Sequence, residues 1–470
     1  MRGSLLSGVP PRARLAGFLA LILAVLGGLY LLAMAVRKAL RPPASEWNLL
    51  WVAIDDFTAD RLGVAGYERG ITPSLDRLAR SGVWGVRCVT QSPWSLPSYA
   101  SMLSSRYPYE LVLNRSYLQH LRAETEVARS RDPYRLPELN VHWYSPLPPD
   151  TPLLAAVLKE RGFATAAWVN NAWLKPGTYG LERGFGDYHD GLAGRSPYTP
   201  ADETAAQAAA WIRERAGGRW FAFVQLMDPH RPYQPHPQYA FGTKMADLYD
   251  AEVAFTDQAV GELLAALEAA GLADRTVVVV SSDHGEGVFA DNADFVGHGG
   301  GVAPAIALVP LILRWPGGPA GREYEALCRN LDLMPTVLEL LQVAGPAGMQ
   351  GRSLLPEIRD RVKTSPEPAF TMAVLKGPEQ VSVLVQGRKP EDLYQGVVIP
   401  AYNQVRVYSL GPDLSPREGA PEAVAAGLIT ALEKFVGGAD RALAEGPPRA
   451  PALLDEKTRA SLKALGYITE

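Results

Sequence analysis

The feature that most constrains the fold is a regular alternation of short apolar runs and amphipathic segments. Continuous apolar runs of this length are typical of strands that are buried on both faces of a parallel sheet. The segments between them have the periodicity of helices with one apolar face. This alternation predicts an α/β domain with a mostly parallel central sheet flanked by helices. The predicted strands are residues 48–54, 164–169, 220–226, 276–280 and 309–313, and the predicted helices are residues 151–161, 203–215, 247–270 and 331–343.

The pattern changes near residue 367. Short β-rich runs separated by turn residues come first, and two helical stretches follow them. This order is typical of a smaller α+β subdomain with an antiparallel sheet, predicted here at 367–470. The main domain then covers residues 47–366, and its polar stretch at 113–150 is predicted to be an insertion over the surface. The β-rich runs are residues 370–375, 381–386 and 405–410, and the helical stretches are residues 421–436 and 454–465.

Residues 15–36 form an uncharged apolar run. As a helix this run would be about 33 Å long, enough to cross a bilayer core of about 30 Å. The sequence therefore predicts a single transmembrane anchor at 15–36, after a tail at 1–14 and before a linker at 37–46. A cleaved signal peptide is the alternative, with the Ala-Met-Ala sequence at 33–35 as the cleavage site. Basic residues lie on both sides of the run, so charge does not decide its orientation.

The composition gives two further limits. The chain of 470 residues has a net charge of −4, and no basic tract stands out. Nucleic acid is therefore not expected as a partner. The two cysteines, Cys88 and Cys328, show neither metal-binding spacing nor a disulfide pattern, so two buried free thiols are expected.

Two of the predicted strands end in clusters of polar residues. Asp55 and Asp56 follow the first strand, and Asp283 and His284 follow a later one. Ligands of parallel sheets gather beyond the carboxyl ends of the strands. Neighbouring carboxylates there raise each other's pKa unless a cation neutralises them, so the two clusters together predict a divalent metal site. Taken alone, Asp55 and Asp56 are equally well explained as capping or solvated residues.

A serine lies between these clusters in the sequence. Ser95 comes just before a proline and a predicted helix at 98–103. A helix N-terminus offers free N–H groups and a positive dipole end, which favour an anion. A hydroxyl group at such a place, beside a metal, is suited to act as a nucleophile. Taken alone, Ser95 and Ser98 are more simply explained as helix N-caps.

Together, these residues resemble the sulfatase family, which belongs to the alkaline-phosphatase superfamily. The resemblance continues in order over nearly all of the chain beyond the predicted anchor. It implies an alkaline-phosphatase-like fold and a metal-dependent hydrolase. The segments that carry it are IDDFTADRLGVAGYERGITPSLDRLARSGVWG from Ile54, QSPWSLPSYASMLSS from Gln91, FAFVQLMDPHRPY from Phe221, SSDHGE from Ser281, GHGGG from Gly297, VPLILRWPG from Val309, LDLMPTVLELL and GRSLLP between Leu331 and Pro356, and the closing ALGYITE.

The resemblance also implies a metal centre. Asp55, Asp56, Asp283 and His284 resemble the metal ligands of the family. One divalent metal ion is implied, which would be Ca²⁺ if the chemistry is sulfatase-like. It would be Zn²⁺ or Mn²⁺ if the chemistry is phosphoryl transfer, because imidazole is a better ligand for zinc than for calcium.

Three catalytic residues follow from the same resemblance. Ser95 occupies the nucleophile position, where sulfatases carry a cysteine or serine that is oxidised to formylglycine. His230 resembles the residue that contacts the transferred group. His298 resembles a lysine or histidine that contacts the leaving-group side.

Several positions depart from the family pattern. Tyr99 stands where the sulfatase maturation pattern has an arginine, and a phenol cannot supply a bidentate cationic fork. Asn170, Asn171 and Gln225 stand in segments where many relatives carry lysine or histidine. The pocket is therefore expected to hold fewer cationic groups than that of a typical arylsulfatase.

Three functions remain open at this point. The first is hydrolysis of a sulfate ester, such as a sulfated glycan or an aryl sulfate, at Ser95. The second is phosphoryl or phosphoethanolamine transfer, or phosphodiester hydrolysis, on a phospholipid or another phosphoester by an unmodified Ser95. The third is a non-catalytic sulfatase-like protein that binds an anion. The resemblance and the anchor imply a single-pass membrane protein whose catalytic domain lies outside the cytoplasm.

Overall fold

The chain divides into two units, Met1–Pro43 and Ala44–Glu470. The second unit contains every predicted site residue. The computed structural model describes residues 19–29, 42–113, 118–119, 121–123, 144–192, 198–287, 297–360, 366–375, 378–411, 414–447 and 449–464.

In the first unit, residues 19–29 form a helix with exposed leucine side chains. At 1.5 Å per residue this helix is about 16 Å long, roughly half of a bilayer core. Among the residues that the structure describes, no helix is both long and apolar enough to cross a membrane. The transmembrane helix predicted at 15–36 is therefore not supported, and residues 15–18 and 30–36 lie outside the described ranges.

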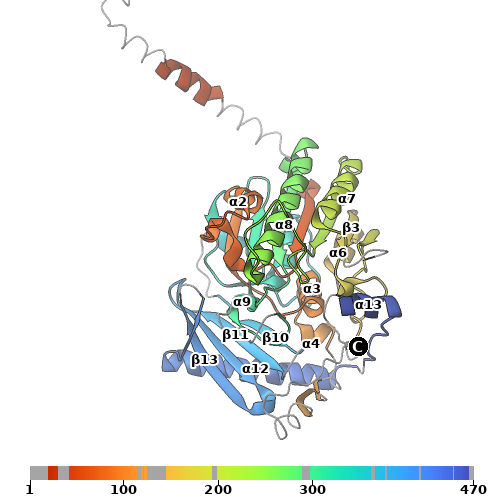
Figure 1. Cartoon of the computed structure of the whole chain (residues 1–470), viewed down its shortest axis with the longest axis vertical. Coiled ribbons are helices and arrows are strands. Elements are labelled where there is room, and N and C mark those ends of the chain that lie inside the picture. The colour runs from red at the N-terminus through yellow and green to blue at the C-terminus, as the bar shows by residue number, and fades with distance from the viewer. Residues whose placement is uncertain are drawn as a thin grey trace, which may run out of the picture. The chain divides into compact units, whose positions relative to one another are not determined.

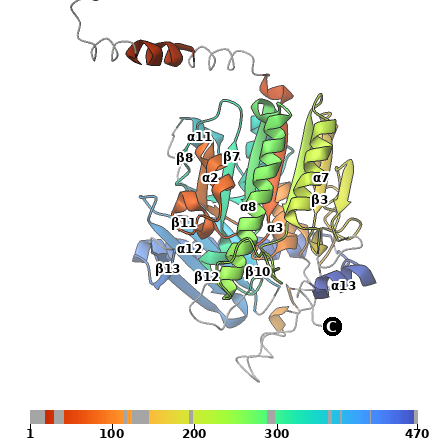
Figure 2. The same cartoon turned by 45° about the horizontal axis from the view of Figure 1, so that its top comes forward.

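The second unit is built on a central sheet with helices on both faces (Figure 1; Figure 2). Five adjacent strands run parallel to one another, namely β4 (Asp187–Asp190), β3 (Ala164–Val169), β5 (Trp220–Leu226), β1 (Asn48–Ile54) and β6 (Thr276–Ser282). The next strand, β7 (Leu308–Arg314), is antiparallel to β6 and to β2 (Val83–Val89). The mostly parallel sheet is thus confirmed. The strand order is β4 (Asp187–Asp190), β3 (Ala164–Val169), β5 (Trp220–Leu226), β1 (Asn48–Ile54), β6 (Thr276–Ser282), β7 (Leu308–Arg314), β2 (Val83–Val89) and β8 (Arg322–Glu323), and β9 (Cys328–Arg329) pairs with β2.

Strand β1 shows why these apolar runs form buried strands. Successive side chains of a strand point to opposite faces of the sheet. Leu50 and Val52 pack into a cluster with one set of helices, whereas Leu49 and Trp51 pack into a cluster with the other. The first set is α2 (Pro73–Arg80), α7 (Ala201–Glu214) and α8 (Met245–Ala269), and the second is α3 (Ser95–Ser104), α6 (Leu154–Glu160) and α10 (Leu333–Leu340).

A second, smaller sheet follows, and it is antiparallel throughout, as predicted. Helix α12 (Glu422–Glu445) packs on it through Leu428 and Leu432. A Cβ atom at Gly396 would lie 3.1 Å from Leu432 and 3.2 Å from Leu428, so this glycine lets the helix come close to the sheet. The strands are β10 (Ala369–Ala373), β11 (Gln380–Gln386), β12 (Leu393–Ile399), β13 (Gln404–Leu410) and β14 (Pro416–Glu418).

The remaining described helices of the second unit are short. Both α9 and α4 begin with a proline, whose fixed φ suits the first helical turn. They are α4 (Pro108–Leu111), α9 (Pro304–Ala307), α11 (Leu355–Asp360) and α13 (Glu456–Ala464), with 3₁₀ turns at Ala44–Glu46, Ala59–Arg61, Gly63–Ala65, Ala172–Leu174, Ala273–Arg275, Asn330–Asp332 and Pro400–Tyr402.

The predicted insertion at 113–150 is only partly described, because residues 124–143 lie outside the described ranges. At its end, Tyr144 is buried, with its ring centroid 4.6 Å from that of Trp94. Its hydroxyl group donates to the carbonyl of Val374. This end of the segment therefore belongs to the core rather than to a surface loop.

Candidate active site

The parallel register of β1 and β6 brings the two predicted clusters together. Ile54 is the partner of Ser282, so Asp55 and Asp283 leave the sheet side by side. The backbone N–H of Asp56 donates to Asp283 Oδ1 over 3.3 Å. Asp56 has a φ of 58°, in the left-handed region that non-glycine residues seldom adopt. Such a conformation persists only where surrounding contacts hold it, and it is frequent at functional sites.

Asp55 is completely buried and holds its side chain in a cage of neutral donors. Its Oδ2 accepts hydrogen bonds from Gln225 Nε2 at 2.8 Å, Asn171 Nδ2 at 3.0 Å and the Tyr99 hydroxyl at 3.2 Å. Within the described residues its Oδ1 has no hydrogen-bond donor. Burial, and next the charge of Asp283, raise the pKa of Asp55 to about 8, although His284 opposes the shift.

His284 lies between the carboxyl groups of Asp56 and Asp283. Its Nδ1 is 2.9 Å from Asp56 Oδ1, and its Nε2 is 3.2 Å from Asp283 Oδ2. Burial lowers the pKa of His284, but the charges of Asp283 and Asp56 outweigh burial and raise it to about 10. The protonated form of His284 is thus stabilised by Asp283 and Asp56.

The donor set fits a divalent cation. Asp55, Asp283 and His284 form one group of possible ligand atoms that lie within 4.8 Å of one another, and Asp56, His230 and His298 form a second. Burial raises the pKa of Asp56 well above its usual range, and the charge of Glu286 adds to this shift. A buried carboxyl group that holds a proton is stabilised when a cation replaces that proton.

Ser95 is the first residue of α3 and is completely buried. Its Oγ accepts a hydrogen bond from Asn171 Nδ2 at 2.9 Å and lies 3.4 Å from His284 Nε2. The N-cap residue is Trp94, and no side chain caps the helix. The hydroxyl group of Ser98 instead donates to the carbonyl of Asp283 at 2.6 Å. The interpretation of the two serines as N-caps is therefore wrong.

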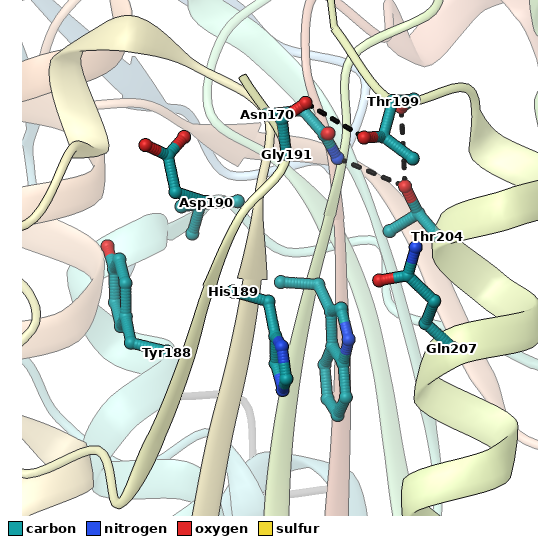
Figure 3. Close-up of a pocket in the computed structure, with 10 residues that line it drawn as sticks. Asn170, Tyr188, His189, Asp190, Gly191, Thr199, Thr204 and Gln207 are labelled. Carbon is teal, nitrogen blue, oxygen red and sulfur yellow. Dashed lines mark hydrogen bonds between the residues drawn. The ribbon is translucent and has the colours of Figure 1, made fainter. Parts of the chain in front are cut away.

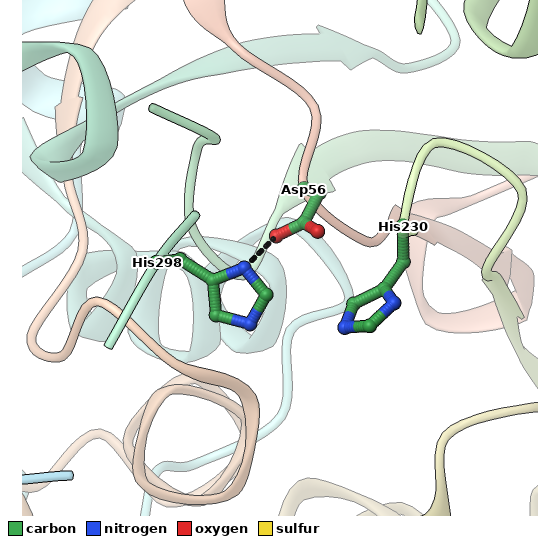
Figure 4. Close-up of side chains that lie close together, drawn as sticks. All are labelled: Asp56, His230 and His298. Carbon is green, nitrogen blue, oxygen red and sulfur yellow. Dashed lines mark ion pairs between the residues drawn. The ribbon is translucent and has the colours of Figure 1, made fainter. Parts of the chain in front are cut away.

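His230 and His298 both lie beside Asp56, as Figure 4 shows. His298 Nδ1 is 3.2 Å from Asp56 Oδ1, and the centroids of the two imidazole rings are 5.1 Å apart. His230 Nδ1 contacts the carbonyl of Arg231. Burial, and then the neighbouring His298, lower the pKa of His230 well below its usual value. His230 is therefore a neutral imidazole near pH 7.

Glu286 lies beside His298. Its carboxylate is completely buried, with Oε2 at 3.4 Å from His298 Nδ1 and 3.7 Å from Arg231 Nε. Burial opposes ionisation, but the hydrogen bond and charge of His298 lower the pKa of Glu286 to about 2. A carboxylate in this position fixes the orientation of the His298 ring.

Asn170 and Asn171 diverge at the end of β3. Asn171 points to Ser95 and Asp55, whereas the amide of Asn170 donates to the carbonyl of Gln225 at 2.8 Å. Asn170 lines a separate pocket of about 380 Å³, together with Tyr188, His189 and Gln207 (Figure 3). Of this pair, only Asn171 therefore belongs to the site. From the sequence, Tyr99, Asn171 and Gln225 were noted only as neutral residues at positions where the resemblance implies cationic ones. Their hydrogen bonds to Asp55 were not predicted.

The family model for sulfatases matches residues 47–343. The chain belongs to the sulfatase family. By family it is a sulfatase-like hydrolase. An ulvan-active sulfatase from Formosa agariphila is 24% identical over 384 residues, which is 70% of this chain and 68% of the relative. A steryl-sulfatase from Rattus norvegicus is 32% identical over 174 residues, or 34% of this chain and 30% of the relative. The match thus covers about two thirds of the ulvan-active sulfatase and less than one third of the steryl-sulfatase.

Solved structures support the alkaline-phosphatase-like fold. A 2-O GAG sulfatase has a TM-score of 0.61 at 17% identity, covering 88% of this chain and 96% of its own. A phosphonate monoester hydrolase from Silicibacter pomeroyi has a TM-score of 0.58 at 19% identity, covering 84% and 96%. A protein in the alkaline phosphatase superfamily from Vibrio parahaemolyticus has a TM-score of 0.59 at 16% identity, covering 85% and 90%. At these identities the likeness concerns the fold alone.

Proposed function

We propose that this chain hydrolyses sulfate esters, with Ser95 as the nucleophile beside one divalent metal ion. The observation that carries the proposal is the contact of Ser95 Oγ with Asn171 and His284 at the point where the two acidic clusters meet. The similarity to proteins named as an ulvan-active sulfatase, a steryl-sulfatase and a 2-O GAG sulfatase supports a sulfate ester as the substrate class. The same class, as a sulfated glycan or an aryl sulfate, is proposed for this chain.

Asp55, Asp56, Asp283 and His284 would hold the metal ion. When bound, such an ion neutralises the anionic ester and lowers the pKa of a hydroxyl group beside it. Three carboxylates favour Ca²⁺, whereas the imidazole of His284 also allows Zn²⁺ or Mn²⁺. The cage of Gln225, Asn171 and Tyr99 on Oδ2 leaves the other oxygen of Asp55 available to the ion.

The chain's own residues then position the reaction. Ser95 sits at the N-terminal end of α3, where backbone N–H groups and the helix dipole favour an anion. Asn171 holds the hydroxyl oxygen of Ser95 and donates to the metal ligand Asp55, which links nucleophile and metal site. His230 and His298 would contact the ester group, and Glu286 keeps the His298 ring in place.

Phosphoester chemistry is the second candidate, and a specific observation favours it. Tyr99 stands at the position of the arginine in the sulfatase maturation pattern, and its hydroxyl group donates to Asp55. The maturation arginine is absent, which favours an unmodified Ser95 that attacks a phosphodiester or phosphonate monoester directly. The fold likeness to a phosphonate monoester hydrolase is consistent with this chemistry. A non-catalytic anion-binding protein is disfavoured, because a buried cluster of carboxylates is costly without a metal.

The mass of the peptide that contains Ser95 separates the two chemistries. The peptide is isolated from the full chain in its native membranes, and metal content is measured on the same preparation. A formylglycine mass supports sulfate-ester hydrolysis. An unmodified serine together with bound zinc favours phosphoryl chemistry. Absence of any bound metal contradicts both and leaves the anion-binding alternative.

We also propose that the catalytic domain lies outside the cytoplasm, held by the apolar run at 15–36. The uncharged sequence and the family membership support this location. A topology reporter fused after Glu470 tests it. Activity of an extracytoplasmic reporter is expected, and strong activity of a cytoplasmic reporter would contradict the proposal.

A further inference from the structure

We propose that Cys88 and Cys328 form an intrachain disulfide bond when the protein is exposed to a disulfide oxidant. The sequence showed no disulfide pattern and indicated two buried free thiols. In the folded chain both are buried in the same core cluster, at 0% and 2% exposure. Both are free thiols in the structure. Their relative position, rather than their spacing in the sequence, carries the proposal.

The pairing of β2 with β9 sets the two cysteines directly opposite each other. The strands are parallel, and Cys88 is the register partner of Cys328. Register partners on neighbouring strands point to the same face, with Cα atoms about 4.8 Å apart. Disulfides usually join Cα atoms about 4.4–6.8 Å apart. The thiols also interact, because Cys328 raises the pKa of Cys88 in addition to the effect of burial.

The reaction needs an external oxidant that itself contains a disulfide. One thiolate attacks the oxidant's S–S bond and forms a mixed disulfide, and the second cysteine then displaces the oxidant's remaining sulfur. The protein gains one Sγ–Sγ bond and loses two hydrogens. The oxidant accepts the two electrons and the two protons and leaves as two thiols. Since burial keeps the Cys88 thiol protonated, the exchange is fastest while the chain is still opening or folding.

The bond would fix a segment that supports the metal site. Strand β9 leads directly into the turn Asn330–Asp332. Asn330 Nδ2 donates to the carbonyl of Ser282 at 2.8 Å, next to Asp283, and its Oδ1 accepts from Cys88 Sγ at 3.4 Å. A disulfide here closes a long loop, from residue 88 to residue 328, and so restricts the unfolded chain strongly.

The test uses the purified full chain and oxidised glutathione as the oxidant. The protein is incubated with glutathione disulfide until its thiol content is constant. It is then denatured in the presence of N-ethylmaleimide, which alkylates free thiols, and its intact mass is measured. The expected product lacks two hydrogens and carries neither maleimide nor glutathione. Its thermal unfolding midpoint is expected to lie roughly 5 °C or more above that of the same protein kept in reductant.

The variant Cys88→Ser is the matched control. Its remaining Cys328 cannot form the bond, so it is expected to carry glutathione or maleimide and to unfold at the same temperature with and without oxidant. Two maleimide or glutathione adducts on the wild-type chain would overturn the proposal, whether or not the control reacts. A disulfide that forms without any shift in the unfolding midpoint would remove its stabilising role.

Discussion

The two sides of the active site differ in kind. On one side, Asp55, Asp283 and His284 are ionisable groups whose side-chain atoms lie close enough to hold one metal ion. On the other side, Asn171 donates to Ser95 Oγ, and the neutral donors of Asn171, Gln225 and Tyr99 meet at Asp55 Oδ2. In the proposed function, the acidic side holds the cation, and the neutral side orients Ser95 and Asp55. Under that proposal, the positive charge that balances an anionic ester comes mainly from the metal ion.

Loss of the nucleophile should give the largest effect. Ser95→Ala is expected to lower kcat for an aryl sulfate by about 10⁴-fold, because no other hydroxyl group replaces Ser95 Oγ. Metal content, measured by elemental analysis, should be unchanged. Ser104→Ala is the matched control, since its hydroxyl group lies on the same helix and donates only to the carbonyl of Ala100 among the described contacts. Equal activity of both variants would remove Ser95 from the mechanism.

Loss of a carboxylate on the acidic side should affect metal and turnover together. Asp283→Asn is expected to lower kcat/KM by about 10³-fold and to lose most of the bound metal, because a metal contributes several kcal/mol of charge stabilisation. Elemental analysis and initial rates measure the two effects. If the variant keeps its metal but loses activity, Asp283 acts on the substrate and the assignment of the two sides fails.

The neutral side should show a smaller effect on the metal. Tyr99→Phe removes one of three donors to Asp55 Oδ2 and keeps the ring packed in the core. Partners of metal ligands typically contribute about 10-fold to 100-fold in affinity, and the lower end is expected here because two donors remain. Titration of the metal-free protein measures the change. An unaltered dissociation constant would show that Tyr99 has no role beyond packing.

Removal of the metal should make stability depend on pH. The pKa of Asp55 is raised to about 8, so the folded state keeps a proton that the unfolded state loses above about pH 4. The pKa of His284 is raised to about 10, so the folded state keeps this proton between about pH 6.5 and pH 10, where the unfolded state loses it. Both effects make the metal-free protein less stable as pH rises. A fall of a few degrees in unfolding midpoint is expected between pH 6 and pH 8.

The metal-loaded protein is the comparison for this experiment. Bound metal replaces these protons, so its unfolding midpoint should change much less over the same range. Calorimetry on both forms provides the measurement. The same slope with and without chelator would mean that the acidic cluster does not bind the metal.

The sequence indicated that the residues of the acidic side lie together but not which neutral residues bond to Asp55, for a physical reason. The apolar run at Asn48–Ile54 directly indicates a strand that is buried on both faces. The residues after it must then lie at the carboxyl end of that strand. The partners of Asp55 come from three other elements and depend on side-chain directions at β3, β5 and α3. Adjacent residues such as Asn170 and Asn171 point different ways, and no periodicity in the sequence distinguishes them.

Two strands show the same limit at the level of the fold. The run at Val309–Leu313 was correctly identified as a strand, but apolarity does not give direction, and β7 is antiparallel to β6. Strand β2 was not predicted, because Gly85 and Arg87 interrupt its apolar pattern and a bulge shifts its register. The apolar run at 15–36 suggested a membrane span that the described helix at 19–29 is too short to provide.

The most direct test of the account compares ester hydrolysis by the metal-loaded full chain with and without Ser95. Release of 4-nitrophenol is followed from 4-nitrophenyl sulfate and from bis(4-nitrophenyl) phosphate, for the wild type, for Ser95→Ala and for the chelated wild type. The account predicts turnover of the sulfate ester at the higher kcat/KM, lost in both other samples. Hydrolysis that persists in Ser95→Ala or after complete metal removal would contradict it.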